Sequence, residues 1–284
     1  DFALDLGESA WDLFKIAQIR RESCESKKYG VNIMRIILMV FLAQILVLFL
    51  HGASDSELIS KALMLNLKPI ELNKNILDLG AGTGVYSIYL ANMGYDVTAV
   101  ELVKHNIEIF EKKNSNVKIY QGNALDLSMF EDESFSVTLL FGPMYHLLNE
   151  EEKLQALSEA KRVTKKSGII FVSYYMNEYG FIKHNIINSL KEQRVDNSFH
   201  MINKENDLYS MVRIEDINKY NKKLGLKRIK IIASDGASDY IRTSLNQMDD
   251  EEFKIFLEYH FKNCERKELL GASSHVLDIL KKND

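Results

Sequence analysis

The sequence is poor in the residues that organise small secreted proteins and nucleic-acid-binding proteins. Among 284 residues there are only two cysteines, Cys24 and Cys264, which form no C-x-x-C pair and no cluster with histidine. Lys and Arg number 36 against 40 Asp and Glu, which gives a net charge of −4. These shortages exclude a disulfide framework or zinc knuckle as the organising principle, and a global basic field that would hold nucleic acid. The cysteine usage fits a reducing compartment, so we expect a cytoplasmic protein.

Internal repeats, low-complexity tracts and metal-binding motifs are also missing. No H-E-x-x-H or equivalent spacing occurs, so no metal is expected. His184 and His200 are interpreted as surface or lid residues. What is present is an average globular composition, 46% hydrophobic and 27% charged, which indicates a chain that folds around a sizeable core.

One long apolar run stands near the N-terminus, at residues 36–50 (IILMVFLAQILVLFL). As a helix it would extend about 22 Å, short of the roughly 30 Å hydrocarbon core of a bilayer. We favour a helix that packs against protein, and keep two alternatives: a membrane-surface or spanning anchor, and the remnant of a targeting segment. Residues 1–53 are therefore an N-terminal helical segment of unclear role, with membrane contact through 36–50 and membrane association as the alternative location.

From residue 54 onward strand-like and helix-like segments alternate. Apolar runs predict strands, and amphipathic stretches between them predict helices. Alternation of this kind is typical of a doubly wound α/β fold, with a mostly parallel sheet covered by helices on both faces. The expected strands are 75–79, 96–101, 117–121, 136–141, 168–175, 226–233 and 275–281, and the expected helices are 84–93, 104–113, 149–164, 239–247 and 249–264. The rhythm breaks after the fifth strand, where residues 176–225 are expected to form a helical lid insertion within a domain spanning 54–284.

A glycine-rich turn follows the first of these strands. The sequence ILDLGAGTG places Gly80, Gly82 and Gly84 between a strand and a helix start. Glycines permit positive φ and close backbone approach, and the free N–H groups at the helix start can face a ligand across the strand tips. The nicotinamide fingerprint would need glycine at position 85, where Val85 stands, so an NAD-dependent oxidoreductase is disfavoured.

An acidic residue, Glu101, ends the second expected strand. From this position a carboxylate in an α/β sheet can accept hydrogen bonds from both ribose hydroxyls. Together with the glycine turn, Glu101 indicates a nucleoside cofactor.

At these residues the sequence resembles the class I S-adenosylmethionine-dependent methyltransferases, whose first motif is an acidic residue followed by G-x-G-x-G. The resemblance extends from residue 70 to the C-terminus and includes TAVE at 98–101, QGNA at 121–124 and FGPMYHL at 141–147. It implies S-adenosyl-L-methionine as the cofactor. The residues that the resemblance places around that cofactor are Asp78, Gly80, Ala81, Gly82, Gly84, Glu101, Leu102, Asn123, Ala124 and Phe141.

The resemblance also implies roles for these residues. The glycine turn packs against the methionine portion, Asp78 helps to order the turn and the amino group, and Glu101 holds the ribose. Asn123 stands where the family more often has Asp, and its carbonyl oxygen can still accept a hydrogen bond from the adenine amino group. Tyr145 and His146 follow the fourth strand and are expected to face the methyl acceptor, where His146 is either a general base or a structural residue.

The function expected from the resemblance is methyl transfer to a nucleophilic atom of a small-molecule acceptor. A protein or tRNA acceptor is an alternative, and so is a regulatory or membrane-tethered module that binds the cofactor without turnover. Neither the acceptor nor the oligomeric state follows from the sequence.

Overall fold

The computed structural model describes residues 75–92, 94–113, 115–188, 195–204 and 207–283. The expected N-terminal helical segment 1–53, with its apolar run 36–50, lies outside these residues. The chain divides into two compact units. One consists of Asn73–Tyr240 with Cys264–Asp284, and the other combines Asp1–Leu72 with Ile241–Asn263.

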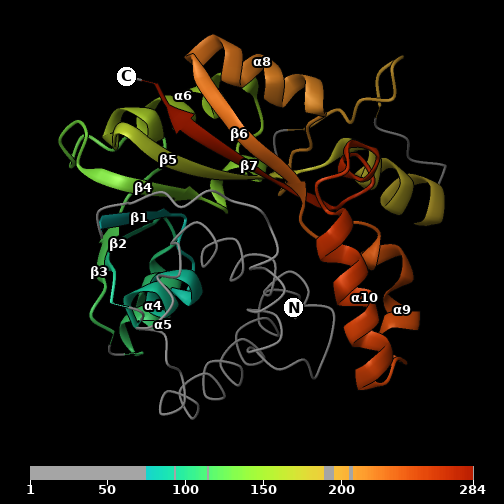
Figure 1. Ribbon diagram of the computed structural model, residues 1–284. Coiled ribbons are helices and arrows are strands. Elements are labelled where there is room, and N and C mark those ends of the chain that lie inside the picture. The colour runs from blue at the N-terminus through green and yellow to red at the C-terminus, as the bar shows by residue number, and fades with distance from the viewer. Residues whose placement is uncertain (1–74, 93, 114, 189–194, 205–206, 284) are drawn as a thin grey trace. The chain divides into compact units, whose positions relative to one another are not determined.

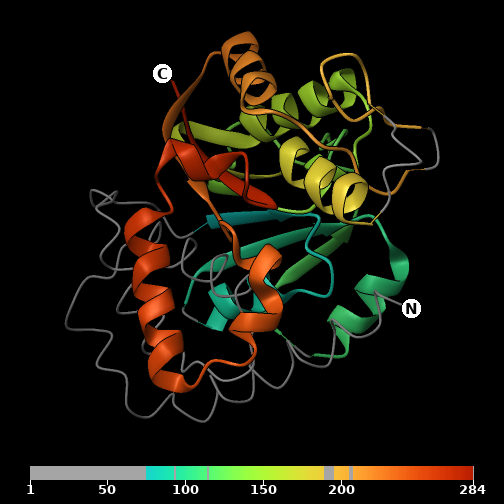
Figure 2. The same ribbon diagram turned by 90° about the vertical axis from the view of Figure 1, so that its right-hand side faces the viewer.

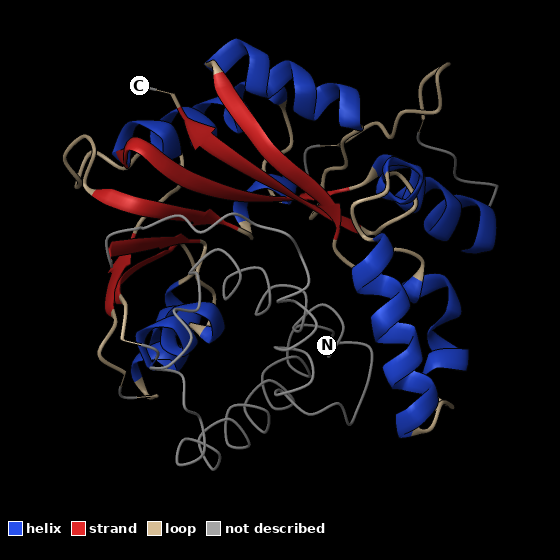
Figure 3. Cartoon of the chain, viewed as in Figure 1, coloured by secondary structure: helices blue, strands red, loops and turns tan. Residues whose placement is uncertain are grey.

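The first unit is built on a seven-stranded sheet, as the sequence predicts (Figures 1 and 3). The strand order is β3-β2-β1-β4-β5-β7-β6, and every neighbouring pair is parallel except the two pairs formed by β7. The strands β1 and β4 are buried over nearly their whole length, because helices cover both faces of the sheet. The strands are β1 (Asn75–Leu79), β2 (Asp96–Glu101), β3 (Lys118–Gln121), β4 (Phe135–Leu140), β5 (Thr164–Tyr175), β6 (Leu226–Ala233) and β7 (His275–Lys282).

Helices lie on opposite faces of this sheet. Figures 1 and 2 show α4 (Val85–Asn92) and α5 (Lys104–Glu111) on one face, and α6 (Glu150–Val163) and α8 (Ile214–Leu224) on the other. The start of α6 is fixed by Asn149, whose side chain accepts a hydrogen bond from the Glu152 backbone N–H at 2.8 Å. Asn149 is therefore the N-cap of α6.

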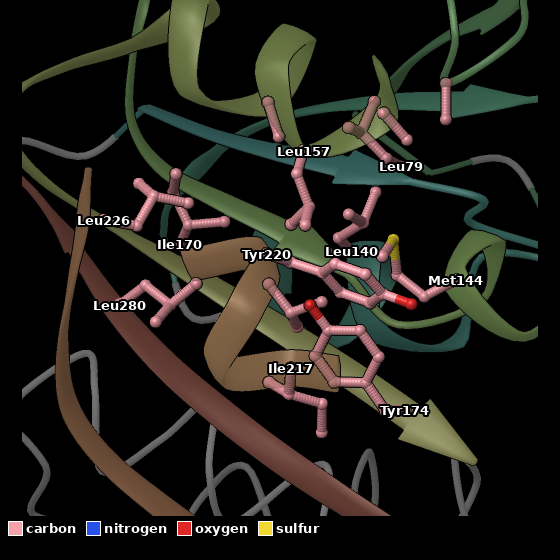
Figure 4. Close-up of a cluster of buried hydrophobic side chains, with 14 of the residues drawn as sticks. Leu79, Leu140, Met144, Leu157, Ile170, Tyr174, Ile217, Tyr220, Leu226 and Leu280 are labelled. Atoms are coloured by element: carbon pink, nitrogen blue, oxygen red, sulfur yellow. The ribbon is translucent and has the colours of Figure 1, made fainter. Parts of the chain in front are cut away.

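A continuous apolar cluster fills the space between the sheet and the helices α6 and α8 (Figure 4). Strand residues such as Leu79, Leu140 and Ile170 are fully buried there, and Leu157 of α6 and Ile217 of α8 pack from the other side. Each fully buried aliphatic side chain contributes about 1.5 to 3 kcal/mol of transfer free energy. This cluster anchors the strand tips that carry the candidate site.

Short helices lie along the edge of the sheet at which the parallel strands end. They are η2 (Pro143–Tyr145), α7 (Asn177–Gly180), the π-helix η3 (Phe181–Asn188), η5 (Ser238–Ile241) and α11 (Lys267–Leu270). The segment 176–225 that the sequence marks as an insertion thus contains α7 and η3, but it also contains α8, which packs against β6 and α6. Closure of this segment as a lid stays a prediction.

The described part of the second unit is a pair of helices, α9 (Arg242–Leu245) and α10 (Asp250–Asn263), where the sequence predicts helices. Leu257, His260 and Phe261 of α10 are buried. Across both units, none of the described helices combines the length and the apolar character needed to cross a bilayer.

Candidate cofactor and acceptor site

The sheet changes direction between β1 and β4. The chain leaves β1 toward β2 on one side, and it leaves β4 toward β5 on the other, so the carboxyl ends of β1 and β4 form a switch point. Ligands of doubly wound folds bind outside the carboxyl ends of the strands at such a point. The Gly80–Gly84 turn follows β1 there, and Phe141 and Pro143 follow β4.

The three glycines of the turn have different tasks, although all three have positive φ (71° at Gly80, 55° at Gly82 and 86° at Gly84). A Cβ at Gly80 would lie 2.7 Å from the Pro143 Cδ, and one at Gly84 would lie 2.5 Å from the Phe110 ring. These two glycines therefore allow close packing. A Cβ at Gly82 would meet no described atom within 4 Å, so this part of the turn leaves room for a ligand.

Asp78 is buried beneath the turn. Its carboxylate accepts a hydrogen bond of 2.6 Å from the Ser87 hydroxyl, which ties β1 to α4. Burial raises the pKa of Asp78 to about 6; the nearby Glu101 charge raises it further, and the hydrogen bonds from Ser87 oppose the rise. Asp78 thus orders the strand–turn–helix connection, while its contact with a cofactor amino group stays a prediction.

Glu101 holds the turn from the neighbouring strand. Its Oε2 accepts from the Gly82 backbone N–H at 2.8 Å, and its Oε1 accepts from the Val103 N–H at 2.9 Å and the Asn106 Nδ2 at 3.2 Å. A carboxylate offers about four acceptor positions, so Oε2 retains one for a ligand hydroxyl. The sequence predicts the ribose contact but not this second role of Glu101, which braces the glycine turn.

The remaining cofactor residues expected from the sequence flank Glu101 and the turn. The Leu102 side chain is 59% exposed, an apolar surface directly after the carboxylate. Asn123 Oδ1 accepts from the Leu125 N–H at 3.0 Å, so its second acceptor position and the amide N–H groups remain for a ligand. Ala124 and Phe141 are buried, and the Phe141 ring meets the Tyr86 ring edge-on at 4.9 Å.

Five aromatic side chains gather past the ends of β4 and β5, and we refer to them as the aromatic cluster. The Tyr145 ring centroid lies 4.9 Å from His146, 6.1 Å from Tyr209 and 5.6 Å from His275, and Tyr175 lies 5.1 Å from His275. Burial, with a smaller contribution from Tyr209, raises the pKa of Tyr145 to about 12, so its hydroxyl stays protonated at neutral pH.

The aromatic cluster adjoins the glycine turn through Tyr86 of α4. Burial raises the pKa of Tyr86 well above its usual range, and the nearby Tyr145 and Asp78 raise it further. Tyr86 thus lies near enough to both Tyr145 and Asp78 to feel their charges. That Tyr145 faces the acceptor stays a prediction.

His146 is exposed, and its Nδ1 lies 2.9 Å from the Leu208 carbonyl oxygen. Because a carbonyl oxygen only accepts, Nδ1 carries the hydrogen and Nε2 is unprotonated in the neutral ring. His184 and His200, which the sequence marks as surface or lid residues, contact Tyr175 and Asp216 respectively.

The structure adds a group that the sequence analysis does not single out: His275 with Ser274 and Asp235. His275 begins β7 opposite Tyr175, and Asp235 follows β6, so the antiparallel pairing of β7 brings both to the ligand edge of the sheet. No spacing motif links positions 40 residues apart, and only the sheet register reveals the group. Within the residues covered by the structure, no set of three or more His, Cys, Asp or Glu side chains is placed to hold a metal ion.

The fold and the glycine turn define a class I, Rossmann-like methyltransferase domain. Residues 77–172, from β1 into β5, match the methyltransferase domain family. This chain therefore carries a class I S-adenosylmethionine-dependent methyltransferase domain, as its resemblance predicts.

Similar proteins agree with this classification. A cypemycin N-terminal methyltransferase from Streptomyces is 33% identical over 37% of this chain and 43% of its own length. A demethylmenaquinone methyltransferase from Renibacterium salmoninarum is 34% identical over 36% of this chain and 41% of its own length. A solved S-adenosylmethionine-dependent methyltransferase from Methanosarcina mazei shares the fold, with a TM-score of 0.51, 15% identity, and coverage of 77% of this chain and 99% of that one. The match thus spans less than half the length of these two curated relatives.

Proposed function

We propose that this protein transfers the methyl group of S-adenosyl-L-methionine to a small-molecule acceptor. The observation that carries the proposal is the glycine turn braced by Glu101: open space before Gly82 and a carboxylate with an unused acceptor position lie together at the switch point. A nucleoside joined to an amino acid suits this combination, because it needs both a ribose acceptor and close backbone approach.

The chain's own residues fit such a cofactor. Glu101 would hold the ribose, Leu102 would cover one face of the adenine, and Asn123 would hydrogen-bond the adenine edge. The backbone of the turn would accommodate the methionine portion in front of Gly82. When bound, the cofactor supplies an electrophilic methyl group, and the protein supplies alignment and exclusion of water.

The aromatic cluster supports a small molecule as acceptor. Flat apolar rings with a few polar atoms are the usual lining of small-molecule sites, and the net charge of −4 offers no general attraction for nucleic acid. The name of one relative points the same way, since demethylmenaquinone is a small molecule. Formation of S-adenosylhomocysteine distinguishes an enzyme from a module that binds the cofactor without turnover.

Gly82 provides the test, with Gly225 as a matched control. Both have positive φ, 55° and 61°, and a Cβ at either would meet no described atom within 4 Å, but Gly225 ends α8 at the opposite edge of the sheet. Both valine substitutions carry a similar backbone strain. We expect Gly82→Val to abolish calorimetric binding of S-adenosylmethionine and S-adenosylhomocysteine, Gly225→Val to retain it, and NAD to bind neither the wild type nor the variants. Unchanged affinity in a folded Gly82→Val protein would falsify the proposal.

A further inference from the structure

We infer that His275 is the general base that takes the proton of the methyl acceptor, held for this task by Ser274 and Asp235. This inference rests on the proposed function, and it assigns the proton acceptor to the start of β7 rather than to His146. It applies to acceptors whose nucleophile carries an N–H or O–H.

Hydrogen-bond directions fix which nitrogen of His275 is bare. The Ser274 hydroxyl donates its hydrogen to the Asp235 Oδ2, and Ser274 Oγ lies 2.9 Å from the His275 Nδ1. A hydroxyl has a single hydrogen, so the bond between Ser274 and His275 must be donated by Nδ1–H. The neutral ring therefore presents an unprotonated Nε2, and no hydrogen bond joins Nε2 to any residue that the structure describes.

The surroundings of His275 favour proton uptake from a ligand. The half-buried ring lies 5.6 Å from Tyr145 and 5.1 Å from Tyr175, within the aromatic cluster and at the ligand edge of the sheet. Asp235 is fully buried, and it also accepts from the Ser273 hydroxyl at 2.5 Å and from the His275 backbone N–H at 3.2 Å. When Nε2 takes a proton, this carboxylate stabilises the imidazolium through Ser274. The Nδ1 of His146 instead contacts a backbone carbonyl oxygen, which is uncharged and stabilises an imidazolium less than a carboxylate does.

Burial and the nearby charges act in opposite directions on the pKa of His275. Burial lowers the pKa of His275, while the nearby Asp235 and Asp239 carboxylates oppose that shift. Asp239 is in turn paired with Lys183 at 2.9 Å and with the Tyr179 hydroxyl, and the Tyr175 hydroxyl contacts the His184 Nε2. Tyr145 and Tyr175 have raised pKa values and remain neutral. A histidine in this setting is unprotonated at pH 7 and can be protonated transiently.

The reaction step balances with the groups already named. The acceptor's nitrogen or oxygen lone pair forms a bond to the methyl carbon while the bond from that carbon to sulfur breaks, and its electron pair stays on sulfur. The acceptor's proton passes to the His275 Nε2 and is released later to water. The cationic sulfonium becomes a neutral thioether as the proton charge moves to His275, so the total charge is unchanged.

Turnover of probe acceptors tests the base. The probes are benzylamine, phenol and benzyl mercaptan, with radiolabelled methyl groups on the cofactor. We expect His275→Ala and His275→Gln to lower turnover of the amine and the phenol by about 10² to 10⁴-fold, with cofactor affinity unchanged within twofold. His146→Ala should cost less than tenfold. The loss with the thiol should be smaller, because thiols give up their proton more readily than alcohols and amines and need less help. Turnover that survives both His275 substitutions, or a larger loss in His146→Ala, overturns the inference but leaves the proposed function standing.

Histidine NMR provides a readout that needs no acceptor. Long-range ¹H–¹⁵N correlations should show His275 protonated on Nδ1 and bare on Nε2 at pH 7, and Ser274→Ala should raise the share of the other tautomer. A wild-type His275 that carries its proton on Nε2, or is cationic at pH 7, rules out the base. A protein that binds no S-adenosylmethionine would instead defeat the proposed function, whatever the tautomer.

Discussion

At the scale of single residues, Glu101 has both a structural role and a proposed role in ligand binding. Its carboxylate shapes the protein by accepting from the backbone N–H groups of Gly82 and Val103, and the same carboxylate is the proposed ribose contact. Removing the carboxylate therefore removes the hydrogen bonds that hold the glycine turn as well as the proposed ligand contact. Binding and stability should change together.

We expect Glu101→Ala to weaken S-adenosylmethionine binding about tenfold or more, because hydrogen bonds to a charged group are worth roughly 1.5 to 3 kcal/mol each. Glu101→Gln should fall between alanine and wild type, since its single carbonyl oxygen replaces only part of the acceptor capacity. Calorimetry gives the affinities, and urea denaturation should show a lower free energy of unfolding for the alanine variant. Glu108→Ala, which removes an exposed carboxylate on α5, is the control. Wild-type affinity in Glu101→Ala would move the ribose contact elsewhere.

Residues of the site differ in how far the sequence predicts them. Gly82 and Glu101 follow from local patterns, because each stands directly after an apolar strand in a recognisable motif. The group of Asp235, Ser274 and His275 has no local pattern, since it depends on the antiparallel pairing of β7 with β5 and β6. Pairing between distant strands is a tertiary property, and periodicity along the chain does not encode it.

At the scale of elements, α6 connects the site to the core. The helix begins five residues after Tyr145, and two hydrogen bonds fix that start: Asn149 accepts from the Glu152 N–H, and the Glu152 Oε2 accepts from the Leu148 N–H at 3.1 Å. Lys153, in the first turns of the helix, donates to the Leu147 carbonyl and to the Ser210 hydroxyl. The start of α6 therefore holds the segment that carries Tyr145 and His146.

Asn149→Ala should lower the free energy of unfolding by about 1 kcal/mol, because a helix N–H loses its acceptor at the N-cap. Asn149→Ser should retain most of the stability, since its hydroxyl can accept the same bond. Urea denaturation of the wild type and both variants measures the difference. Equal transition midpoints for all three proteins would show that the cap contributes nothing.

The regular elements could be predicted closely from the sequence, whereas the segment after β5 could not. The expected bounds of β1, β2 and β6 agree with the structure. β1 and β2 are buried strands, which form short apolar runs with polar residues at their ends. In the 176–225 segment the apolar residues follow no single period, and the structure places there a short α-helix, a π-helix and then α8. A π-helix has no sequence signature that periodicity can detect.

At the scale of the whole sheet-bearing unit, strand order collects functional groups from distant parts of the chain at one edge. Gly80 follows β1, Tyr145 follows β4, and Tyr175 ends β5. The antiparallel strand β7 adds His275 at its beginning, opposite Tyr175. A doubly wound sheet thus builds one candidate site from residues nearly 200 positions apart in the sequence. This arrangement buries ionisable groups, and their burial lowers the free energy of unfolding when they are charged.

The cost of one such charge should be visible in the pH dependence of folding. The pKa of Asp78 is about 6 in the folded protein against 3.8 when unperturbed, so between these values the folded state binds more protons than the unfolded state. Asp78 therefore contributes stability that is fully present below pH 4 and is lost as the pH rises through 6. A shift of about 2 pKa units corresponds to about 3 kcal/mol.

Asp78→Asn isolates this contribution, because the amide cannot ionise and its oxygen can still accept the hydrogen bond from the Ser87 hydroxyl. Relative to wild type, the variant should gain about 3 kcal/mol of unfolding free energy between pH 4 and pH 7, since only the wild type must bury a charge at neutral pH. Urea denaturation across this range measures the difference, in which the titration of all other groups cancels. The prediction is wrong if the difference in unfolding free energy between variant and wild type stays constant with pH. Asp78 would then ionise as easily in the folded protein as in the unfolded chain, and burial would impose no penalty on its carboxylate.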